Sequence, residues 1–353
     1  MYICKMKAKK IVVNQTIQFK AYSKVCALGK ARDDVNRTLS DCGYDVEIIL
    51  CKRYPVPFLS NLMGLLKNMA MIFRHPLGSE YVVQYPVSSK VIFPWVLRLQ
   101  RLLGNKVTIL VHDIQTVRNG RDLSPDLRVF RLASRILTHT EAMSRWIHDH
   151  GVATPSEAIQ LFDYYTDDDF RPREDLLRHK KEIAFAGYLR KSSFFTPLSA
   201  HDFRDLTFNL YGKTDDDFRV SGNVRYLGVF ESNHTAAVEG GWGLVWDGTS
   251  IDTCEGDLGD YLRLIASHKL SLYLAMGIPV IVWKDSAEAE FVTREGLGIA
   301  VSGLKELPDR ISAISDEEYG RMLDRCRAQG SVLRRGGMLK KRVNGMDGTV
   351  CPC

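Results

Sequence analysis

A pair of cationic or titratable side chains stands at the start of an otherwise apolar segment, SHKLSLYLAMGIPVIVW, which spans residues 267–283. Ser267 is a favoured N-cap and Gly277 a favoured helix stop, so the pattern predicts a buried helix between them. His268 and Lys269 would then lie in the first turn, where a cation opposes the helix dipole at a cost of ~0.3–1 kcal/mol. An anion bound at the helix start removes this conflict, so we predict a phosphate site here. The alternative is a lysine that simply extends into water.

Loops that follow other predicted strands could complete such a site, because ligands of open α/β sheets bind beyond the carboxyl ends of the strands. Gly187 and Lys191 follow the predicted strand Glu182–Ala186, and they combine close backbone approach with a cation that can reach a phosphate. The loop DGTSIDTCEGDLGDY follows Gly243–Trp246, and its carboxylates could accept hydrogen bonds from sugar hydroxyls. A solvated basic turn and a disordered surface loop are the respective alternatives.

The first half of the chain has its own acid/base candidates. The stretch VHDIQTVRNG places His112 and Asp113 at the carboxyl end of a predicted strand, Val107–Val111. A carboxylate in this position could deprotonate the hydroxyl of an acceptor. The alternative is a histidine and an aspartate whose polar atoms are satisfied by the backbone. The sequence lacks the GxGxxG, Walker, GxSxG and HExxH patterns, which counts against oxidoreductases, kinases, hydrolases and zinc proteases.

These candidates need a framework of parallel strands, and the hydrophobic pattern predicts one. Short apolar segments alternate with helical stretches along the chain, which is typical of an α/β fold with doubly wound, Rossmann-like sheets. The predicted strands are Ile11–Val13, Asp45–Leu50, Tyr81–Tyr85, Val107–Val111 and Arg135–His139, followed by Glu182–Ala186, Phe208–Tyr211, Gly243–Trp246, Pro279–Trp283 and Gly298–Val301.

An acidic stretch, DYYTDDDFRPRED, begins at Asp163 and divides the two halves, so we interpret it as a linker. The predicted domains are residues 1–165 and 166–335. Residues 336–353 are assigned to a divergent tail, since the final VNGMDGTVCPC does not resemble a closing helix.

The composition narrows the class of protein. The 353 residues are 45% hydrophobic and 25% charged, which suits a globular protein of two domains. The net charge of +6 is too small for a dedicated nucleic-acid binder, but it is compatible with anionic ligands or an anionic membrane surface. The eight cysteines have no metal-ligand spacing, and MYICKMKAKK is no secretory signal. We therefore expect free thiols and a cytoplasmic location.

One apolar segment raises the question of membrane contact. FLSNLMGLLKNMAMIFRH, residues 58–75, is strongly apolar and carries Lys67 and Arg74. It could lie on the inner face of the plasma membrane, where lipid-linked acceptors reside. We favour the alternative, a buried helix of the first domain. No apolar segment reaches the ~18 residues of a membrane-spanning helix.

Several stretches resemble a bacterial glycosyltransferase family of the GT-B fold, in which two Rossmann-like domains face a cleft. They are AFAGYLRKSSFF, GLVWDG, GDLGDYLRLIASHKLSLYLAMGIPVIVW and AEFVTREGLGIAV in the second half, with KARDDV and VHDIQTVR as looser matches in the first. The family includes β-1,6-galactofuranosyltransferases of O-antigen synthesis and a streptococcal glucosyltransferase that extends the sugar on a serine-rich adhesin. The resemblance extends over nearly the whole chain, to about Gly337.

The resemblance implies a UDP-sugar donor, with the UDP held by the C-terminal domain. The residues it places at the donor are Lys191, Tyr211, Asp247, Tyr261, His268, Lys269 and Tyr273. The acceptor, a lipid-linked or protein-linked glycan, would enter near the catalytic candidates His112 and Asp113. No metal or other cofactor is expected, because the cationic helix start would stabilise the leaving diphosphate. A homo-oligomer is compatible with the family.

The sequence leaves more than one possibility for the stereochemistry at the transferred sugar and for the activity itself. Retaining GT-B relatives often carry two glutamates eight positions apart, whereas Glu288 and Glu295 are seven apart and position 296 is glycine. This spacing favours an inverting single displacement. The alternatives are a retaining hexosyltransferase, a UDP-sugar epimerase, or a non-catalytic UDP-sugar-binding partner of another transferase.

Overall fold

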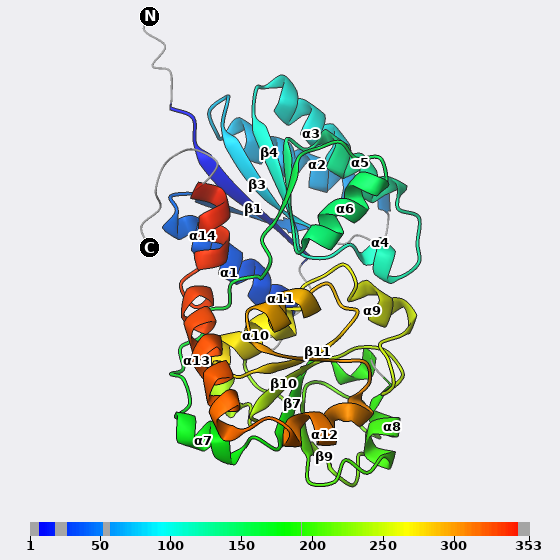
Figure 1. Ribbon diagram of the computed structural model, residues 1–353. Helices are drawn as coiled ribbons and strands as arrows, with labels where there is room; N and C mark the ends of the chain where they lie inside the picture. Colours follow the sequence, from blue (N-terminus) through cyan, green and yellow to red (C-terminus); the bar gives the residue numbers. More distant parts are fainter. Residues whose placement is uncertain (1–6, 18–26, 52–56, 192, 345–353) are drawn as a thin grey trace, which may run out of the picture. The chain divides into compact units, whose positions relative to one another are not determined.

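The computed structural model describes residues 7–17, 27–51, 57–191 and 193–344. By their internal contacts, the residues divide into two compact units. The first unit comprises Met1–Ser23, Arg32–Gln160 and Leu339–Cys353, and the second comprises Lys24–Ala31 and Leu161–Met338. Each unit has a parallel sheet flanked by helices (Figure 1).

The first unit is built on a six-stranded parallel sheet with the order β2-β1-β3-β4-β5-β6. Its strands are β1 (Lys10–Ile17), β2 (Asp45–Cys51), β3 (Glu80–Tyr85), β4 (Lys106–Val111), β5 (Arg135–Thr138) and β6 (Ser156–Ala158). The central strands are buried on both faces: Val12 lies between Val46 of β2 and Val82 of β3, and it is fully buried. Such apolar strands are typical of a sheet covered by helices on both faces.

In the described part of the chain, six helices lie between successive strands of the first sheet. They are α1 (Ala27–Asp41), α2 (Pro57–Phe73), α3 (Phe93–Leu102), α4 (Gln115–Arg118), α5 (Ser124–Leu132) and α6 (Glu141–Asp149). A further helix, α14 (Gly337–Asn344), comes from the end of the chain. Helix α14 joins this unit through ion pairs of Lys340 with Asp41 and of Arg342 with Glu157. The described part of the predicted tail is therefore helical and packed, while 345–353 lies outside the described residues.

The second unit repeats the architecture with the strand order β12-β11-β10-β7-β8-β9. Its strands are β7 (Glu182–Ala186), β8 (Thr207–Tyr211), β9 (Val224–Tyr226), β10 (Trp242–Val245), β11 (Val280–Trp283) and β12 (Gly298–Val301). Its helices are α7 (Arg173–Arg178), α8 (Phe195–Ala200), α9 (Gly256–Tyr261), α10 (His268–Met276), α11 (Ala289–Arg294), α12 (Leu307–Ser312) and α13 (Asp316–Leu333), with short 3₁₀ turns at Leu189–Lys191, Thr235–Ala237 and Leu304–Glu306. One apolar cluster fills the space between this sheet and its helices.

The ten predicted strands are confirmed, and the structure adds β6 and β9. Each of these is only three residues long and lies at the edge of its sheet. So short a segment has no hydrophobic periodicity that a sequence pattern could reveal. The contacts divide the chain after Gln160, whereas the sequence-based boundary lies at residue 165.

Helix α2 corresponds to the apolar segment 58–75. We predicted that this segment is a buried helix of the first domain, and the prediction is wrong for one side of the helix. Met71 and Ile72 are buried against the sheet, as expected for a helix of the first domain. Phe58, Leu66 and Phe73, however, are exposed. The helix is apolar all round, so its composition could not indicate which side the sheet would cover.

Candidate functional site

The winding direction of the second sheet changes between β7 and β10. From β7 the chain runs outward to β8 and β9, then returns to place β10 on the other side of β7. Connections therefore leave these two neighbouring strands in opposite directions, which is the point where open α/β sheets bind ligands. The loops at 187–191 and 246–255 follow the two strands, and α10 begins at the same edge (Figure 1).

The start and end of α10 are as predicted. Ser267 is the N-cap, and its side chain accepts a hydrogen bond from the Lys269 amide at 3.3 Å. Gly277 ends the helix in the left-handed conformation with φ of 76°, which a glycine adopts without strain. Every residue from Leu270 to Met276 is buried. The first turn is thus held firmly at the sheet edge.

Lys269 lies over the ends of both central strands. Its Nζ donates to Asp247 Oδ2 at 2.8 Å and to the Trp246 carbonyl at 3.0 Å, both at the end of β10. The same ammonium group lies 4.5 Å from the ring centre of Phe185 in β7, a cation–π contact. Only 14% of the side chain is exposed, so the alternative of a lysine extending into water does not hold. The pairing brings together two residues predicted to bind the donor.

His268 points into a different environment from its neighbour. Its ring centre lies 5.2 Å from that of Tyr164 and 6.5 Å from that of Phe162. These aromatic residues belong to the buried segment Leu161–Tyr165, which follows the first unit in the sequence. Nothing in the sequence pattern indicated this cluster, because Tyr164 falls within the acidic stretch that was interpreted as a linker.

Glu288 is a buried carboxylate at the start of α11. The helix begins at Ala289 and has no side-chain cap, so Glu288 is its N-cap residue. Its side chain points inward, where Oε2 accepts a hydrogen bond from the Ser267 amide at 2.8 Å and Oε1 has no hydrogen-bond partner among the described residues. Burial raises the pKa of Glu288 to about 8, although the Ser267 amide and the Lys269 ammonium act in the opposite direction.

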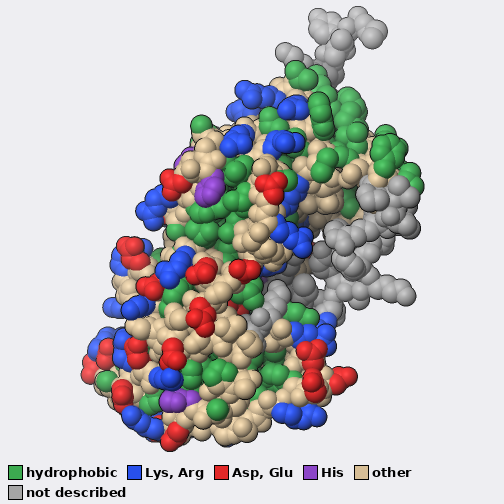
Figure 2. All heavy atoms as spheres, turned by 90° about the vertical axis from the view of Figure 1, so that its right-hand side faces the viewer, with side chains coloured by type: hydrophobic (Ala, Val, Ile, Leu, Met, Phe, Trp, Pro, Cys, Tyr) green, Lys and Arg blue, Asp and Glu red, His purple; other side chains and the backbone are tan. Residues whose placement is uncertain are grey.

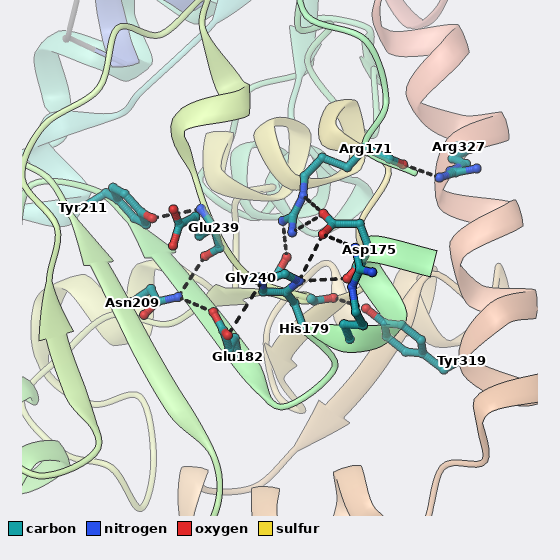
Figure 3. Close-up of polar contacts among 12 residues, drawn as sticks. Arg171, Asp175, His179, Glu182, Asn209, Tyr211, Glu239, Gly240, Tyr319 and Arg327 are labelled. Atoms are coloured by element: carbon teal, nitrogen blue, oxygen red, sulfur yellow. Dashed lines mark hydrogen bonds and ion pairs between the residues drawn. The ribbon is translucent and has the colours of Figure 1, made fainter. Parts of the chain in front are cut away.

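Tyr211, at the end of β8, serves as an anchor inside the second unit (Figure 3). Its hydroxyl oxygen accepts a hydrogen bond from the Glu239 amide at 2.8 Å, while Asn209 donates to the Glu239 carbonyl at 3.2 Å. Burial raises the pKa of Tyr211. These bonds hold the segment that enters β10. Its predicted contact with the nucleotide stays a prediction.

The other residues predicted to bind the UDP-sugar donor are Tyr273, Tyr261 and Lys191. Tyr273 is fully buried in α10, and its hydroxyl oxygen accepts a hydrogen bond from the Ala186 amide at 2.7 Å. In this position it ties α10 to the end of β7. Tyr261 is buried at the end of α9. Lys191 ends a 3₁₀ turn, and its side chain lies outside the described part of the chain.

Two glycines allow β7 and β8 to end in close contact. A Cβ at Gly212, where φ is +143°, would lie 1.6 Å from the Gly187 carbonyl oxygen. A Cβ at Gly187 would in turn lie 3.1 Å from Lys269 Cε. The backbone at these strand ends is thus packed directly against the lysine, which is the close approach that the sequence predicted for Gly187.

The loop after β10 also lines an open hollow of about 520 Å³, formed with Pro197, His201 and Lys305. Its acidic side chains are engaged there, since Lys305 pairs with Asp252 at 2.9 Å and Thr249 donates to Glu255 at 3.1 Å. Asp252 and Glu255 belong to the loop whose carboxylates were predicted to bind sugar hydroxyls, but none of the individual residues predicted to bind the donor lines the hollow. We therefore place the candidate site at the strand ends around Lys269, where a cation and a helix N-terminus coincide.

In the first unit, His112 and Asp113 follow β4 at the carboxyl edge of the sheet. His112 Nε2 lies 2.8 Å from Gln84 Oε1, an acceptor, so this ring nitrogen carries the proton. Asp113 Oδ2 pairs with Arg118 at 2.9 Å, and its Oδ1 is buried without a hydrogen-bond partner among the described residues. The alternative of an aspartate satisfied by the backbone therefore does not hold for Asp113. A carboxylate with one unused oxygen retains the capacity to accept a proton.

Arg32 is the feature of the first unit whose importance the sequence did not reveal. It is buried in α1, and its guanidinium donates to neutral oxygens at the ends of β1 and β3. The acceptors are Asn14 Oδ1 at 3.0 Å and the carbonyls of Gln15 at 3.3 Å, Gln84 at 3.4 Å and Pro86 at 2.6 Å. Since β1 and β3 are the strands at which this sheet changes winding direction, Arg32 cross-links the strand ends at the equivalent place.

Two doubly wound parallel units, each with polar side chains at the carboxyl edge, define the class of GT-B proteins. A solved structure supports this: the sucrose-phosphate synthase of Thermosynechococcus elongatus aligns with a TM-score of 0.66, over 96% of this chain and 100% of that chain. At 12% identity, this likeness concerns the fold alone.

The sequence comparisons define the family. Residues 10–160 match the N-terminal domain and residues 183–346 the C-terminal domain described as Glucosyltransferase 3-like. The chain belongs to this family and is a glycosyltransferase. It is 35% identical over 258 residues to Glucosyltransferase 3 of Streptococcus gordonii, covering 68% of this chain and 70% of the relative. It is 27% identical over 286 residues to the β-1,6-galactofuranosyltransferase WbbI of Escherichia coli K12, covering 79% of each.

Proposed function

We propose that the chain transfers a hexose, of the galactofuranose or glucose type, from a UDP-sugar to a hydroxyl of a glycan acceptor in the synthesis of a surface polysaccharide or glycoprotein. The observation that carries the proposal is the Lys269 ammonium at the start of α10, over the ends of β7 and β10. Names of the relatives, a glucosyltransferase and a galactofuranosyltransferase, support a hexose as the transferred group.

The diphosphate of the donor would bind at the start of α10. The positive end of the helix dipole favours an anion there, and Lys269 adds a full charge. As the bond between the sugar C1 and the diphosphate breaks, negative charge develops on the leaving oxygen. Lys269 and the helix start would stabilise that charge, so the reaction needs no metal in this proposal.

The acceptor would bind to the first unit, at the carboxyl edge of its sheet. Its hydroxyl oxygen attacks C1 and forms the new glycosidic bond, while its proton passes to the Asp113 carboxylate. Arg118, paired with Asp113, holds the carboxylate in place. We propose a single displacement with inversion at C1. A lipid-linked or a protein-linked glycan would satisfy this chemistry equally, and a homo-oligomer is compatible with it.

The proposal is tested by calorimetric titration with UDP, followed by a panel of UDP-sugars with mass spectrometry of the products. We expect UDP to bind, and Lys269→Ala to lower its affinity by more than about tenfold, or ~1.4 kcal/mol. Lys284→Ala is the matched control, because this exposed lysine directly follows β11. Unchanged affinity in Lys269→Ala would remove the lysine from the site.

The products formed from the UDP-sugars distinguish the proposed inverting transferase from a binding partner, an epimerase and a retaining transferase. UDP binding without hydrolysis or transfer of any donor would indicate a binding partner of another transferase. Conversion of one UDP-sugar into another would indicate an epimerase. The anomeric configuration of the product, read by NMR, distinguishes inversion from retention.

A further inference from the structure

Helix α2 presents an apolar stripe to the outside of the first unit. Phe58, Leu62, Leu66 and Phe73 are exposed, and their spacings of four and seven residues place them on one side of the helix. Leu59 extends the same side. The stripe runs the length of the 17-residue helix, or about 25 Å at 1.5 Å per residue.

Helix α3 continues the apolar surface. Val91, Trp95 and Leu102 are exposed, with spacings of four and seven residues, and Trp95 and Leu102 are exposed by 64% and 84%. Helices α2 and α3 pack against each other. Their ends also meet, since the Gly78 amide donates to the Leu103 carbonyl at 3.4 Å, which brings exposed Leu77 beside Leu102.

We call this surface the α2–α3 face. It consists of residues whose large apolar side chains are exposed. They are Phe58, Leu59, Leu62, Leu66, Phe73, Leu77, Val91, Trp95 and Leu102. Single exposed apolar residues are ordinary, but a continuous surface of this kind marks an interaction site. Figure 2 shows hydrophobic side chains gathered on the surface of the first unit, with lysines and arginines beside them.

The charges around the face identify the partner it suits. Between residues 57 and 106 the sequence has six lysines and arginines and one acidic residue, Glu80. Three of these cations, Arg74, Lys90 and Lys106, form ion pairs with Glu47, Asp126 and Glu80. Arg98 and Arg101 lie on α3 and form no ion pair within the described part of the chain, and the Arg98 guanidinium lies 4.6 Å from the Trp95 ring centre. A second copy of this chain docked on the same face would bring like charges together. An anionic surface would neutralise them.

We propose that the α2–α3 face binds the surface of an anionic lipid bilayer. The stripe of α2 would enter the boundary between headgroups and acyl chains, while Arg98 and Arg101 would contact lipid phosphates. Trp95 suits this boundary, because its amphipathic ring favours the headgroup level. Among the described residues, no helix is long and apolar enough to cross a membrane.

The α2–α3 face extends from one edge of the first sheet to the other. Leu77 precedes β3 and Leu102 precedes β4, so this end of the face lies at the amino ends of the strands. Phe58 follows β2 and Val91 follows β3, so the opposite end lies at the carboxyl ends, the edge at which His112 and Asp113 follow β4.

The test is co-sedimentation of the full chain with vesicles. We expect binding to vesicles that contain phosphatidylglycerol, weak binding to phosphatidylcholine alone, and a loss of binding with added salt. The double variant Leu66→Glu/Phe73→Glu should bind at least about tenfold more weakly, since it places charge in the apolar stripe. Arg98→Glu/Arg101→Glu should lose the preference for phosphatidylglycerol.

The matched control is Leu227→Glu/Val229→Glu, which changes two exposed apolar residues of the second unit. Circular dichroism and UDP titration should be unchanged in all variants, which separates this proposal from the proposed donor site. Absence of vesicle binding by the natural chain, or equal binding by the stripe and control variants, would overturn it. If the natural chain instead forms a dimer that only Leu66→Glu/Phe73→Glu dissociates, the face is a self-association surface and the lipid proposal fails.

Discussion

The two sheets each place a buried cation where their winding direction changes, but the cations are held differently. Lys269 in the second unit has a flexible stem and shares its ammonium between Asp247 and one carbonyl. Arg32 in the first unit donates to four oxygens from two segments, at the ends of β1 and β3. A lysine held by one carboxylate can exchange that partner for a phosphate, whereas an arginine held by four acceptors acts as a cross-link. Lys269 is therefore suited to ligand binding, whereas Arg32, at the equivalent place in the first sheet, has a structural role.

The largest expected effect tests whether the first unit supplies the base and the second unit binds the donor. Asp113→Asn should lower the transfer rate by about 10²–10⁴-fold, because an amide cannot accept the proton of the acceptor hydroxyl. UDP affinity should be unchanged, since the proposed donor site belongs to the second unit. Initial rates and UDP titration measure the two effects, with Asp149→Asn on exposed α6 as control. Full activity in Asp113→Asn would refute its role as base.

Arg32→Ala tests the structural cation. Removing a buried guanidinium leaves four acceptors without a donor, so the free energy of unfolding should fall by about 3–5 kcal/mol. Arg37→Ala changes an exposed arginine of the same helix and should cost less than about 1 kcal/mol. Urea unfolding followed by circular dichroism measures both. If the two variants are equally stable, Arg32 does not cross-link the ends of β1 and β3.

The pH dependence of stability tests the surroundings of Lys269. With its pKa raised to about 8, Glu288 keeps its proton in the folded chain at pH values where an unfolded glutamate has lost it. The free energy of unfolding should therefore fall as the pH rises from about 5 to about 8, by up to about 1.4 kcal/mol per pH unit, and level off above. Glu288→Gln should abolish this slope, because glutamine does not titrate.

Glu290→Gln, an exposed neighbour on α11, should retain the slope of the natural chain. Urea unfolding at a series of pH values measures it. A slope that survives in Glu288→Gln would show that another group is responsible.

The smallest effect concerns the exchangeable partner of Lys269. Asp247→Asn should strengthen the binding of UDP by about three- to fivefold, under 1 kcal/mol, because Asp247 then no longer competes with the diphosphate. For a UDP-sugar the gain should shrink or reverse if Asp247 also accepts a sugar hydroxyl. Titration with UDP and with a UDP-sugar separates the two roles. Weaker binding of UDP itself would contradict the exchange of partners.

The sequence predicted the parts of the fold and of the candidate site that depend on local pattern. The strands, the N-cap Ser267 and the stop Gly277 follow from periodicity and backbone preference, and these were confirmed. The position of Lys269 at a sheet edge follows from the cap and from the alternation of strands and helices, since α10 leads into β11.

The features that sequence reasoning missed depend on contacts between distant segments. Glu288 reaches the Ser267 amide, and Arg32 reaches carbonyls more than fifty residues away, in Gln84 and Pro86. No local pattern predicts such contacts. The exposed side of α2 was missed for a related reason, since a helix that is apolar all round does not reveal which side is covered.

The close contact between Gly212 and Gly187 affects how a mutational scan of this protein should be interpreted. Any side chain at position 212 meets the Gly187 carbonyl oxygen, and one at position 187 presses on Lys269. Position 212 should therefore tolerate almost no substitution, in a pattern that resembles that of catalytic residues, whereas a side chain at 187 requires the end of Lys269 to shift by a few tenths of an ångström. Neither has a side chain that could take part in a reaction. Abundance of the folded chain, scored alongside activity, would separate such steric intolerance from chemical necessity.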